Sequence, residues 1–216
     1  MEARIDSPAD RLEAVAEGLY RDGWHVDPGF LNPELAAALL EEVMAHDRAA
    51  RLERAGIGRG TDHTLAENIR GDRTRWLDGS SPAQLALLDR MEALRLTINR
   101  HLMLGLFDYE AHFALYPAGS FYKRHLDSFH GARDRIVTTV LYLTPDWRPE
   151  DEGYLRIYAP QSDERLAEVR PEAGTLACFL SEEIPHEVLP TRRERTSIAG
   201  WFRRNTSQGQ APDPAR

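Results

Sequence analysis

Long hydrophobic runs are missing from this chain, and cysteine is almost missing. No apolar stretch approaches the 18 or so residues that a membrane-spanning helix needs, and the first residues lack a signal-peptide core. We therefore expect no membrane partner. Cys178 is the only cysteine, which excludes an internal disulfide and predicts a reducing, cytoplasmic location. It lies in an apolar, strand-like run, where a small buried side chain is expected rather than a nucleophile.

Positive charge is also in deficit. The 27 lysines and arginines face 35 aspartates and glutamates, which gives a formal net charge of −8. Binding to a phosphate backbone draws its affinity from lysine and arginine, so we expect no nucleic-acid partner. The 216 residues, 42% of them hydrophobic, are enough for one compact domain with a substantial core.

The first hundred residues carry the signals of helices rather than strands. Three times, a side chain that can cap a helix N-terminus is followed by proline, which suits the first helical turn. Apolar residues recur at helical spacing after each start, and glycine follows each run. The predicted helices begin at Pro8, Pro33 and Pro82 and end near Gly23, Gly56 and Gly105.

After residue 111 the pattern changes to short β segments separated by turn residues, which indicates an antiparallel sandwich or barrel. The expected strands cover residues 112–116, 136–144, 154–159, 175–180, 186–189 and 196–203. We divide the single compact domain into a helical N-terminal support (1–105), a β core (106–204) and a flexible tail (205–216). Within the support, residues 56–79 begin with three glycines in five residues and are expected to be a mobile loop, with short strands between residues 69 and 77.

The spacing His-x-Asp could mark a metal site, but it occurs twice. Side chains two apart on a strand face the same side, so His125 and Asp127 can reach one point. The pair His25 and Asp27 has the same spacing, but it lies in a connection between predicted helices. The spacing alone therefore does not separate a metal site from a polar surface pair.

A second histidine from a later strand would complete a mononuclear iron(II) site, which needs two imidazoles and one carboxylate on one face. His186 is the best candidate, because it begins an apolar strand just after a proline turn. The alternative is that His125 and Asp127 form a surface pair while His186 is a partly buried core histidine.

The strand after His186 favours the metal site. On it, Arg195, Ser197, Ala199 and Trp201 share one face. A guanidinium followed by two small side chains leaves an empty lane with a carboxylate clamp at one end, which suits a bound dicarboxylate better than a packed interior. An exposed edge strand that begins with arginine is the alternative.

The order of several motifs resembles a known family. Tyr-Pro-x-Gly, Tyr-x-x-His-x-Asp, Leu-Tyr-Leu-x-x-Asp-Trp and Pro-His-Glu-Val-x-Pro are followed by Arg195. This order resembles the iron(II)- and 2-oxoglutarate-dependent prolyl hydroxylases, and more narrowly the branch of the animal hypoxia-inducible-factor prolyl hydroxylases and their bacterial relatives. The stretch from Ile69 to Trp76 is similar to a finger-loop segment of that branch, and the resemblance covers roughly residues 65–203.

The resemblance implies a mainly β fold, a double-stranded β-helix (jelly roll) supported by N-terminal helices. It implies peptidyl-prolyl 4-hydroxylase activity with Fe(II), 2-oxoglutarate as cosubstrate and ascorbate as a reductant. The implied partner is a protein with an exposed proline, with elongation factor Tu as one candidate. The residues it assigns are the metal ligands His125, Asp127 and His186, the cosubstrate-binding Arg195, Tyr142 and Tyr116, and the pocket residues Trp201, Arg70, Asp72 and Trp76.

Two alternatives stay open. The first is a 2-oxoglutarate oxygenase that acts on another residue type or on a small molecule. The second is a non-catalytic jelly-roll module that binds metal or peptide, for which a dicarboxylate clamp at Arg195 would have no use.

Overall fold

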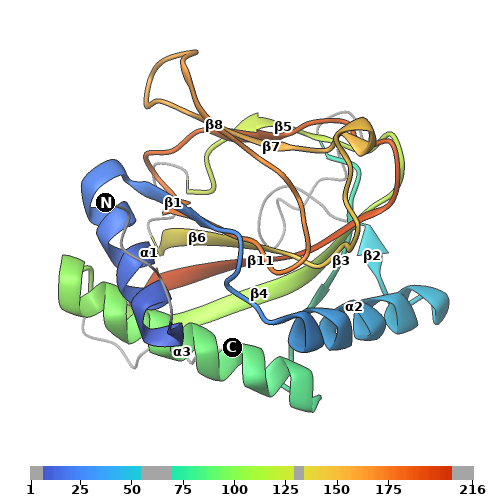
Figure 1. The fold of residues 1–216 in the computed structure, drawn as a ribbon, viewed down its shortest axis with the longest axis horizontal. Helices are drawn as coiled ribbons and strands as arrows, with labels where there is room; N and C mark the ends of the chain where they lie inside the picture. Colours follow the sequence, from blue (N-terminus) through green and yellow to red (C-terminus); the bar gives the residue numbers. More distant parts are fainter. Residues whose placement is uncertain (1–6, 55–69, 129–133, 206–216) are drawn as a thin grey trace.

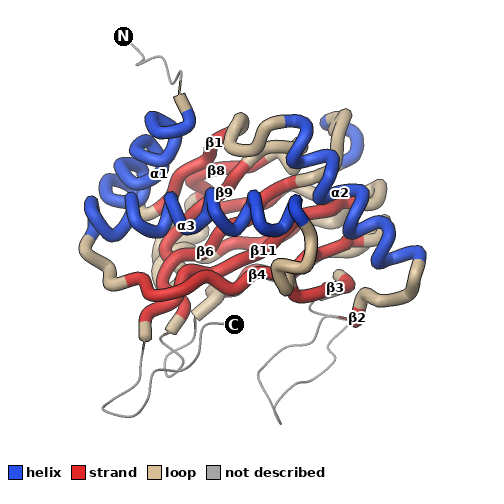
Figure 2. The backbone as a smooth tube through the Cα atoms, turned by 90° about the horizontal axis from the view of Figure 1, so that it is seen from below, coloured by secondary structure: helices blue, strands red, loops and turns tan. Residues whose placement is uncertain are grey.

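Two antiparallel β-sheets face each other, and helices cover the outer face of the larger one (Figures 1 and 2). The computed structural model describes residues 7–54, 70–128 and 134–205. The larger sheet has the order β1 (Trp24–Asp27), β9 (Leu176–Leu180), β6 (Arg135–Tyr142), β11 (Arg195–Arg204), β4 (Leu106–Tyr116), β3 (Arg73–Trp76) and β2 (Glu53–Arg54). The smaller sheet has the order β5 (Tyr122–His125), β10 (His186–Val188), β7 (Leu155–Tyr158) and β8 (Arg165–Val169). The predicted fold class is confirmed: the β-strands form a jelly roll supported by helices.

The helices begin where the capping signals predict. They are α1 (Pro8–Asp22), α2 (Pro33–Arg48) and α3 (Pro82–Leu102), and in each the predicted cap side chain accepts a hydrogen bond from a backbone N–H of the first turn. No helix among the described residues has the length and apolar character needed to span a membrane.

The helix ends are predicted less well than the starts. Helix α1 ends at Gly23, which adopts the left-handed conformation as expected. Helix α2 was expected to reach about Gly56 but ends at Arg48, because the chain turns there to pair β2 with β3. Helix α3 stops before Gly105, and Met103 takes the left-handed capping conformation with a φ of 52°.

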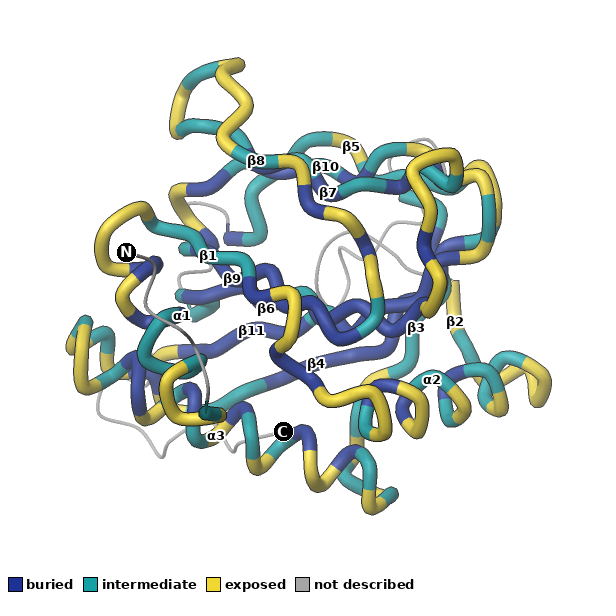
Figure 3. Tube along the Cα trace, in the orientation of Figure 1, coloured by how far each residue is buried: buried dark blue, intermediate teal, exposed yellow. Residues whose placement is uncertain are grey.

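The core has two layers, one on each side of the larger sheet. The outer layer joins the helices to the sheet and includes Leu39, Leu94, Ile198 and Phe202. The inner layer lies between the two sheets and includes the side chains of Tyr116, Tyr142, Leu155, Ile157 and Phe179. Figure 3 shows the buried stretches running through β4, β6, β9 and β11. The central strands are therefore buried on both faces, and the inner layer forms the wall of the barrel.

The segment around His25, predicted to be a connection between two helices, is a β-strand instead. His25, Val26 and Asp27 belong to β1, which pairs with β9 at the edge of the larger sheet. The Asp27 carboxylate accepts hydrogen bonds from Arg11 at 2.5 Å and from the backbone of Gly29 at 2.9 Å. A four-residue strand directly before a Pro-Gly turn has too little alternation to be recognised from sequence. The second His-x-Asp pair therefore anchors an edge strand to α1.

Candidate metal and dicarboxylate site

Three residues predicted as metal ligands meet inside the jelly roll. His125 ends β5 and His186 begins β10, and the two residues face each other in the register of the smaller sheet. Asp127 follows β5, and one potential ligand atom from each of the three side chains lies within 4.8 Å of the others. Across residues 7–54, 70–128 and 134–205, no other cluster of three His, Cys, Asp or Glu side chains meets this criterion.

Backbone carbonyls orient both imidazole rings toward the carboxylate. His125 Nδ1 lies 2.7 Å from the carbonyl of Lys123, and His186 Nδ1 lies 3.1 Å from the carbonyl of Ile184. A carbonyl only accepts, so Nδ1 carries the proton and Nε2 presents its lone pair. The Nε2 atoms lie 3.4 Å and 3.6 Å from the Asp127 carboxylate. This donor set fits an iron(II)-type ion, which binds imidazole nitrogen and carboxylate oxygen.

Asp127 is held in place by two donors from the larger sheet. Its Oδ2 accepts hydrogen bonds from Thr138 Oγ1 at 2.8 Å and from Trp201 Nε1 at 3.0 Å. Burial alone would raise the pKa of Asp127, but His186 and His125 outweigh it and hold the pKa well below its usual range. The carboxylate is therefore ionised at neutral pH and can accept a cation.

The two histidines differ in their surroundings. Burial, followed by the charge of His125, lowers the pKa of His186 to about 4, so its imidazole is neutral at pH 7. Its ring packs against Phe179, with ring centroids 4.5 Å apart. The His125 ring stacks on Tyr122 at 3.6 Å. Tyr122 had no predicted role, and it now lies directly against one of the three clustered side chains.

Arg195 is a buried cation without a carboxylate partner among the described residues. It is 1% exposed, and two of its nitrogens, Nε and one terminal nitrogen, have no hydrogen-bond partner in residues 7–54, 70–128 and 134–205. The buried hydroxyl of Tyr142 has none either. The guanidinium carbon lies 4.9 Å from the ring centroids of both Tyr142 and Tyr116. Unsatisfied buried polar groups are costly, so these atoms fit a bound carboxylate that they could share.

The residues of the predicted lane lie along β11, in register with β6. Ser197 lies opposite Tyr142 in the register with β6, and Trp201 lies opposite Thr138. The two small side chains of Ser197 and Ala199 separate Arg195 at one end from Trp201 at the other. Because Trp201 donates to Asp127, the lane connects the unpartnered guanidinium to the three clustered side chains.

Part of the predicted finger loop lies beside this site. Arg70 binds Asp72 at 2.5 Å, and its guanidinium carbon lies 4.6 Å from the centroid of the Tyr122 ring. Trp76 is 50% exposed, and its ring centroid lies 6.4 Å from that of Trp201. Residues 55–69 of the loop lie outside the described residues.

Sequence reasoning missed several residues that support the site. Thr138 lies on the same alternation as Tyr142, so its inward direction was available from the strand pattern. The ring of His112 contacts Trp76 edge-on, with ring centroids 5.2 Å apart, and its centroid lies 5.4 Å from that of Trp201. Burial, followed by the charge of Arg70, lowers its pKa to about 4, so this ring is neutral. These contacts depend on pairing between distant strands, which no local motif encodes.

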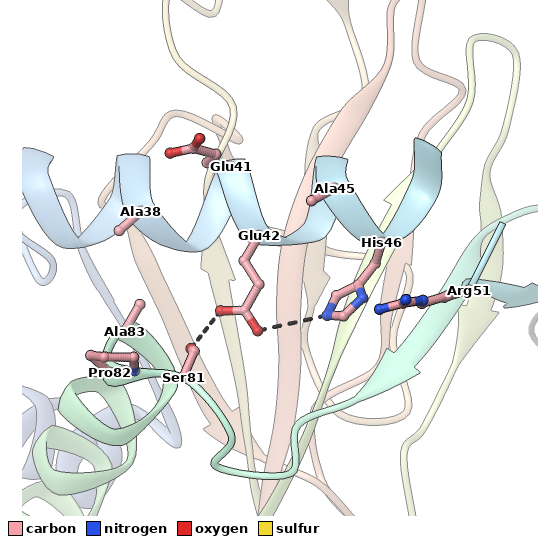
Figure 4. Close-up of a pocket in the computed structure, with 9 residues that line it drawn as sticks. All are labelled: Ala38, Glu41, Glu42, Ala45, His46, Arg51, Ser81, Pro82 and Ala83. Atoms are coloured by element: carbon pink, nitrogen blue, oxygen red, sulfur yellow. Dashed lines mark hydrogen bonds and ion pairs between the residues drawn. The ribbon is translucent and has the colours of Figure 1, made fainter. Parts of the chain in front are cut away.

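A separate cavity of about 510 Å³ lies between α2 and the start of α3 (Figure 4). None of the predicted site residues lines it. The Glu42 carboxylate at its base accepts hydrogen bonds from Ser81 at 2.6 Å and from Gln84 at 2.5 Å, and lies 3.7 Å from His46. The Glu42 carboxylate is thus engaged in joining two helices.

Comparisons with known proteins agree with this location. Residues 111–203 match the 2OG-Fe(II) oxygenase superfamily. Egl nine homolog 1 of rat and of human are each 30% identical to this chain over 201 residues, which is 88% of the chain. The matched region covers 58% of the rat protein and 46% of the human protein, so the chain spans about half the length of these curated relatives.

Solved structures extend the similarity to nearly the whole chain. A Pseudomonas putida prolyl-4-hydroxylase is 45% identical, with a TM-score of 0.82 and coverage of 89% of this chain and 99% of that one. A Trichoplax adhaerens prolyl hydroxylase, solved with a hypoxia-inducible-factor peptide fragment, has the same TM-score of 0.82 at 24% identity, covering 93% of this chain and 94% of that one. The chain belongs to the 2OG-Fe(II) oxygenase superfamily, in the branch of the hypoxia-inducible-factor prolyl hydroxylases and their bacterial relatives.

Proposed function

We propose that this protein is an iron(II)- and 2-oxoglutarate-dependent dioxygenase that hydroxylates C4 of a prolyl residue in a protein substrate. One observation carries the proposal: the His125, Asp127 and His186 cluster lies at one end of a lane whose other end holds the unpartnered nitrogens of Arg195. Two separate binding needs, for a cation and for a dicarboxylate, thus meet in one interior.

In this proposal His125, Asp127 and His186 hold the iron. Arg195 binds the distal carboxylate of 2-oxoglutarate, and the Tyr142 hydroxyl donates to the same carboxylate. Burial raises the pKa of Tyr142, so the hydroxyl keeps its proton at neutral pH and remains a donor. Tyr116 lies directly opposite Arg195 in the β4 register and forms the wall beside the cosubstrate.

When bound, iron(II) and 2-oxoglutarate supply an oxidation by dioxygen in which the cosubstrate becomes succinate and carbon dioxide. The contribution of the protein is to orient the two groups and to exclude water from them. Phe179 and Trp201 provide the apolar wall around the cluster. Ascorbate is the proposed reductant that keeps the iron in the ferrous state.

The protein substrate contacts the described end of the finger loop in this proposal. Arg70, Asp72 and the half-exposed Trp76 lie on the side of the site where β3 and β5 approach each other. The solved Trichoplax relative is in complex with a peptide, and the Pseudomonas relative is a prolyl-4-hydroxylase. A proline of elongation factor Tu is our candidate target, and the single, buried Cys178 is consistent with a cytoplasmic location.

The test is turnover with defined components. We expect iron-dependent succinate formation that a proline-containing peptide of elongation factor Tu stimulates, with one added oxygen on the proline. Asp127→Ala should abolish both signals. An added oxygen on another residue type or on a small molecule would favour the broader oxygenase assignment. Failure of 2-oxoglutarate to bind in the presence of manganese would favour a non-catalytic module.

A further inference from the structure

An arginine side chain lies over the face of the Trp201 ring. Arg135 begins β6, and its guanidinium carbon lies 3.6 Å from the centroid of the Trp201 ring. Trp201 itself is 7% exposed and uses its only N–H to bind Asp127 Oδ2. A cation over an indole face is attracted by the negative face of the ring, by about 0.5–2 kcal/mol depending on desolvation. The ring that orients the carboxylate is therefore itself oriented by Arg135.

Arg135 is in turn held by a buried carboxylate. Glu110 Oε1 accepts from Arg135 Nε at 2.8 Å and lies 2.7 Å from a terminal nitrogen of the same guanidinium. The Glu110 side chain is only 4% exposed, and the residue lies opposite Trp201 in the β4–β11 register. The three residues lie on three adjacent strands, so the sheet registers fix their relative positions.

A second arginine, Arg203, shares this network because it lies beside the same Glu110 carboxylate. Arg203 lies 3.5 Å from Glu110 Oε2, and its Nε donates to Asp108 Oδ1 at 2.9 Å. Buried ion pairs are poor sources of net stability, because the cost of desolvating the charges offsets their attraction. Their clear structural consequence here is the position that Arg135 takes on the neighbouring indole ring.

We propose that Glu110 and Arg135 are positioning residues for the metal ligand Asp127, acting through Trp201. Arg135 fixes the plane of the indole, and Glu110 fixes Arg135. The indole N–H then stays on Oδ2 together with Thr138, so Oδ1 is the oxygen presented to the metal. This inference rests on the proposed metal site, and it assigns to Glu110 and Arg135 an effect on Asp127 that runs through the Trp201 indole.

The test is a titration of the metal-free protein with Mn²⁺, with free Mn²⁺ measured by electron paramagnetic resonance. Loss of an interaction that orients a metal ligand typically weakens metal binding by about 10–100-fold. We expect Arg135→Met to weaken Mn²⁺ binding by about tenfold, at the lower end of that range. Glu110→Gln should weaken Mn²⁺ binding less than Arg135→Met does. Arg135→Lys, which keeps the cation, should recover part of the affinity that Arg135→Met loses.

Asp108→Asn is the matched control, because it breaks the neighbouring ion pair but leaves Arg135 over the indole. Asp108→Asn should change Mn²⁺ affinity by less than about twofold. The thermal stability should fall in both Asp108→Asn and Arg135→Met. The visible spectrum of the Co²⁺-loaded protein provides a second readout, since it reports the ligand geometry. We expect a changed spectrum in Arg135→Met and Glu110→Gln and an unchanged one in Asp108→Asn.

The inference is overturned if Arg135→Met and Glu110→Gln bind Mn²⁺ as the wild type does, or if Asp108→Asn loses as much affinity as they do. If Arg135→Met does not fold, Glu110→Gln and Arg135→Lys carry the same comparison. Failure of the underlying metal site looks different, because His186→Ala would then leave wild-type Mn²⁺ binding unchanged.

Discussion

The two faces of β11 differ in how well their side chains are packed and hydrogen-bonded. On the face toward the helices, Ile198 and Phe202 are fully buried in a packed apolar layer. Between them, a Cβ added to Gly200 would lie 2.2 Å from the Tyr109 hydroxyl, so this face has no room to spare. On the face toward the smaller sheet, two nitrogens of Arg195 are buried without hydrogen-bond partners in the part of the chain that the structure describes. One strand thus supplies stability on one face and unsatisfied binding groups on the other.

The difference between the packed and the polar face of β11 indicates where a binding site lies in such a sheet. A strand buried on both faces normally carries large apolar residues on both. Here the inner face carries a cation, two small side chains and an indole whose N–H is directed at a carboxylate. The departure from a packed interior, rather than the His-x-Asp spacing, separates this site from the pair in β1.

The largest expected effect lies on the helix-facing side. Phe202→Ala should lower the free energy of unfolding by about 3–5 kcal/mol, because it leaves a cavity in a close-packed layer. The protein that remains folded should bind Mn²⁺ with unchanged affinity. Chemical denaturation and Mn²⁺ titration on the same samples measure the two effects. A large loss of Mn²⁺ affinity in folded protein would contradict the separation of the two faces.

Replacement of Arg195 should change the free energy of unfolding in the opposite direction. Without 2-oxoglutarate, Arg195→Met should raise the free energy of unfolding by about 1–4 kcal/mol, because it removes an uncompensated buried charge. The matched control is Arg203→Met on the same strand, whose arginine is paired with Asp108. That variant should be destabilised, since it takes the paired arginine away from the largely covered Asp108 carboxylate. Equal destabilisation of both variants would show that Arg195 has structural partners after all.

The smallest change concerns one hydroxyl. Tyr142→Phe should alter the free energy of unfolding by less than about 0.5 kcal/mol, because the buried hydroxyl has no well-formed hydrogen bond to any described residue. It should weaken 2-oxoglutarate binding by about tenfold, the value of a hydrogen bond to a charged group. Thermal denaturation and calorimetric titration in the presence of Mn²⁺ measure these two quantities. A stable variant with unchanged cosubstrate affinity would remove Tyr142 from the site.

Local patterns predicted much of the fold. The cap-and-proline signals located the starts of all three α-helices among the described residues, because capping depends on residues within one turn. Strand alternation correctly placed Arg195 and Trp201 on one face of β11. The early end of α2 and the short β1 were missed, because strand pairing with distant residues decides both.

The supporting contacts of the site depend on register. Trp201 lies opposite both Thr138 and Glu110, and those pairings bring together strands that are far apart in sequence. No spacing within one strand reveals that an indole will meet Asp127 or that Arg135 will cover the indole. The candidate ligands could be named from sequence, whereas the residues that orient them required the structure.

Calorimetric titration of 2-oxoglutarate into the Mn²⁺-loaded protein tests the central claim most directly. We expect one 2-oxoglutarate site per chain. Its affinity should fall by at least about a hundredfold in Arg195→Met, as expected when a buried charge loses its partner. Arg195→Met should still bind Mn²⁺, because the three clustered side chains do not involve the guanidinium. Absence of 2-oxoglutarate binding to the wild type, or equal binding to Arg195→Met, would contradict the assignment of the inner face of β11 as the cosubstrate site.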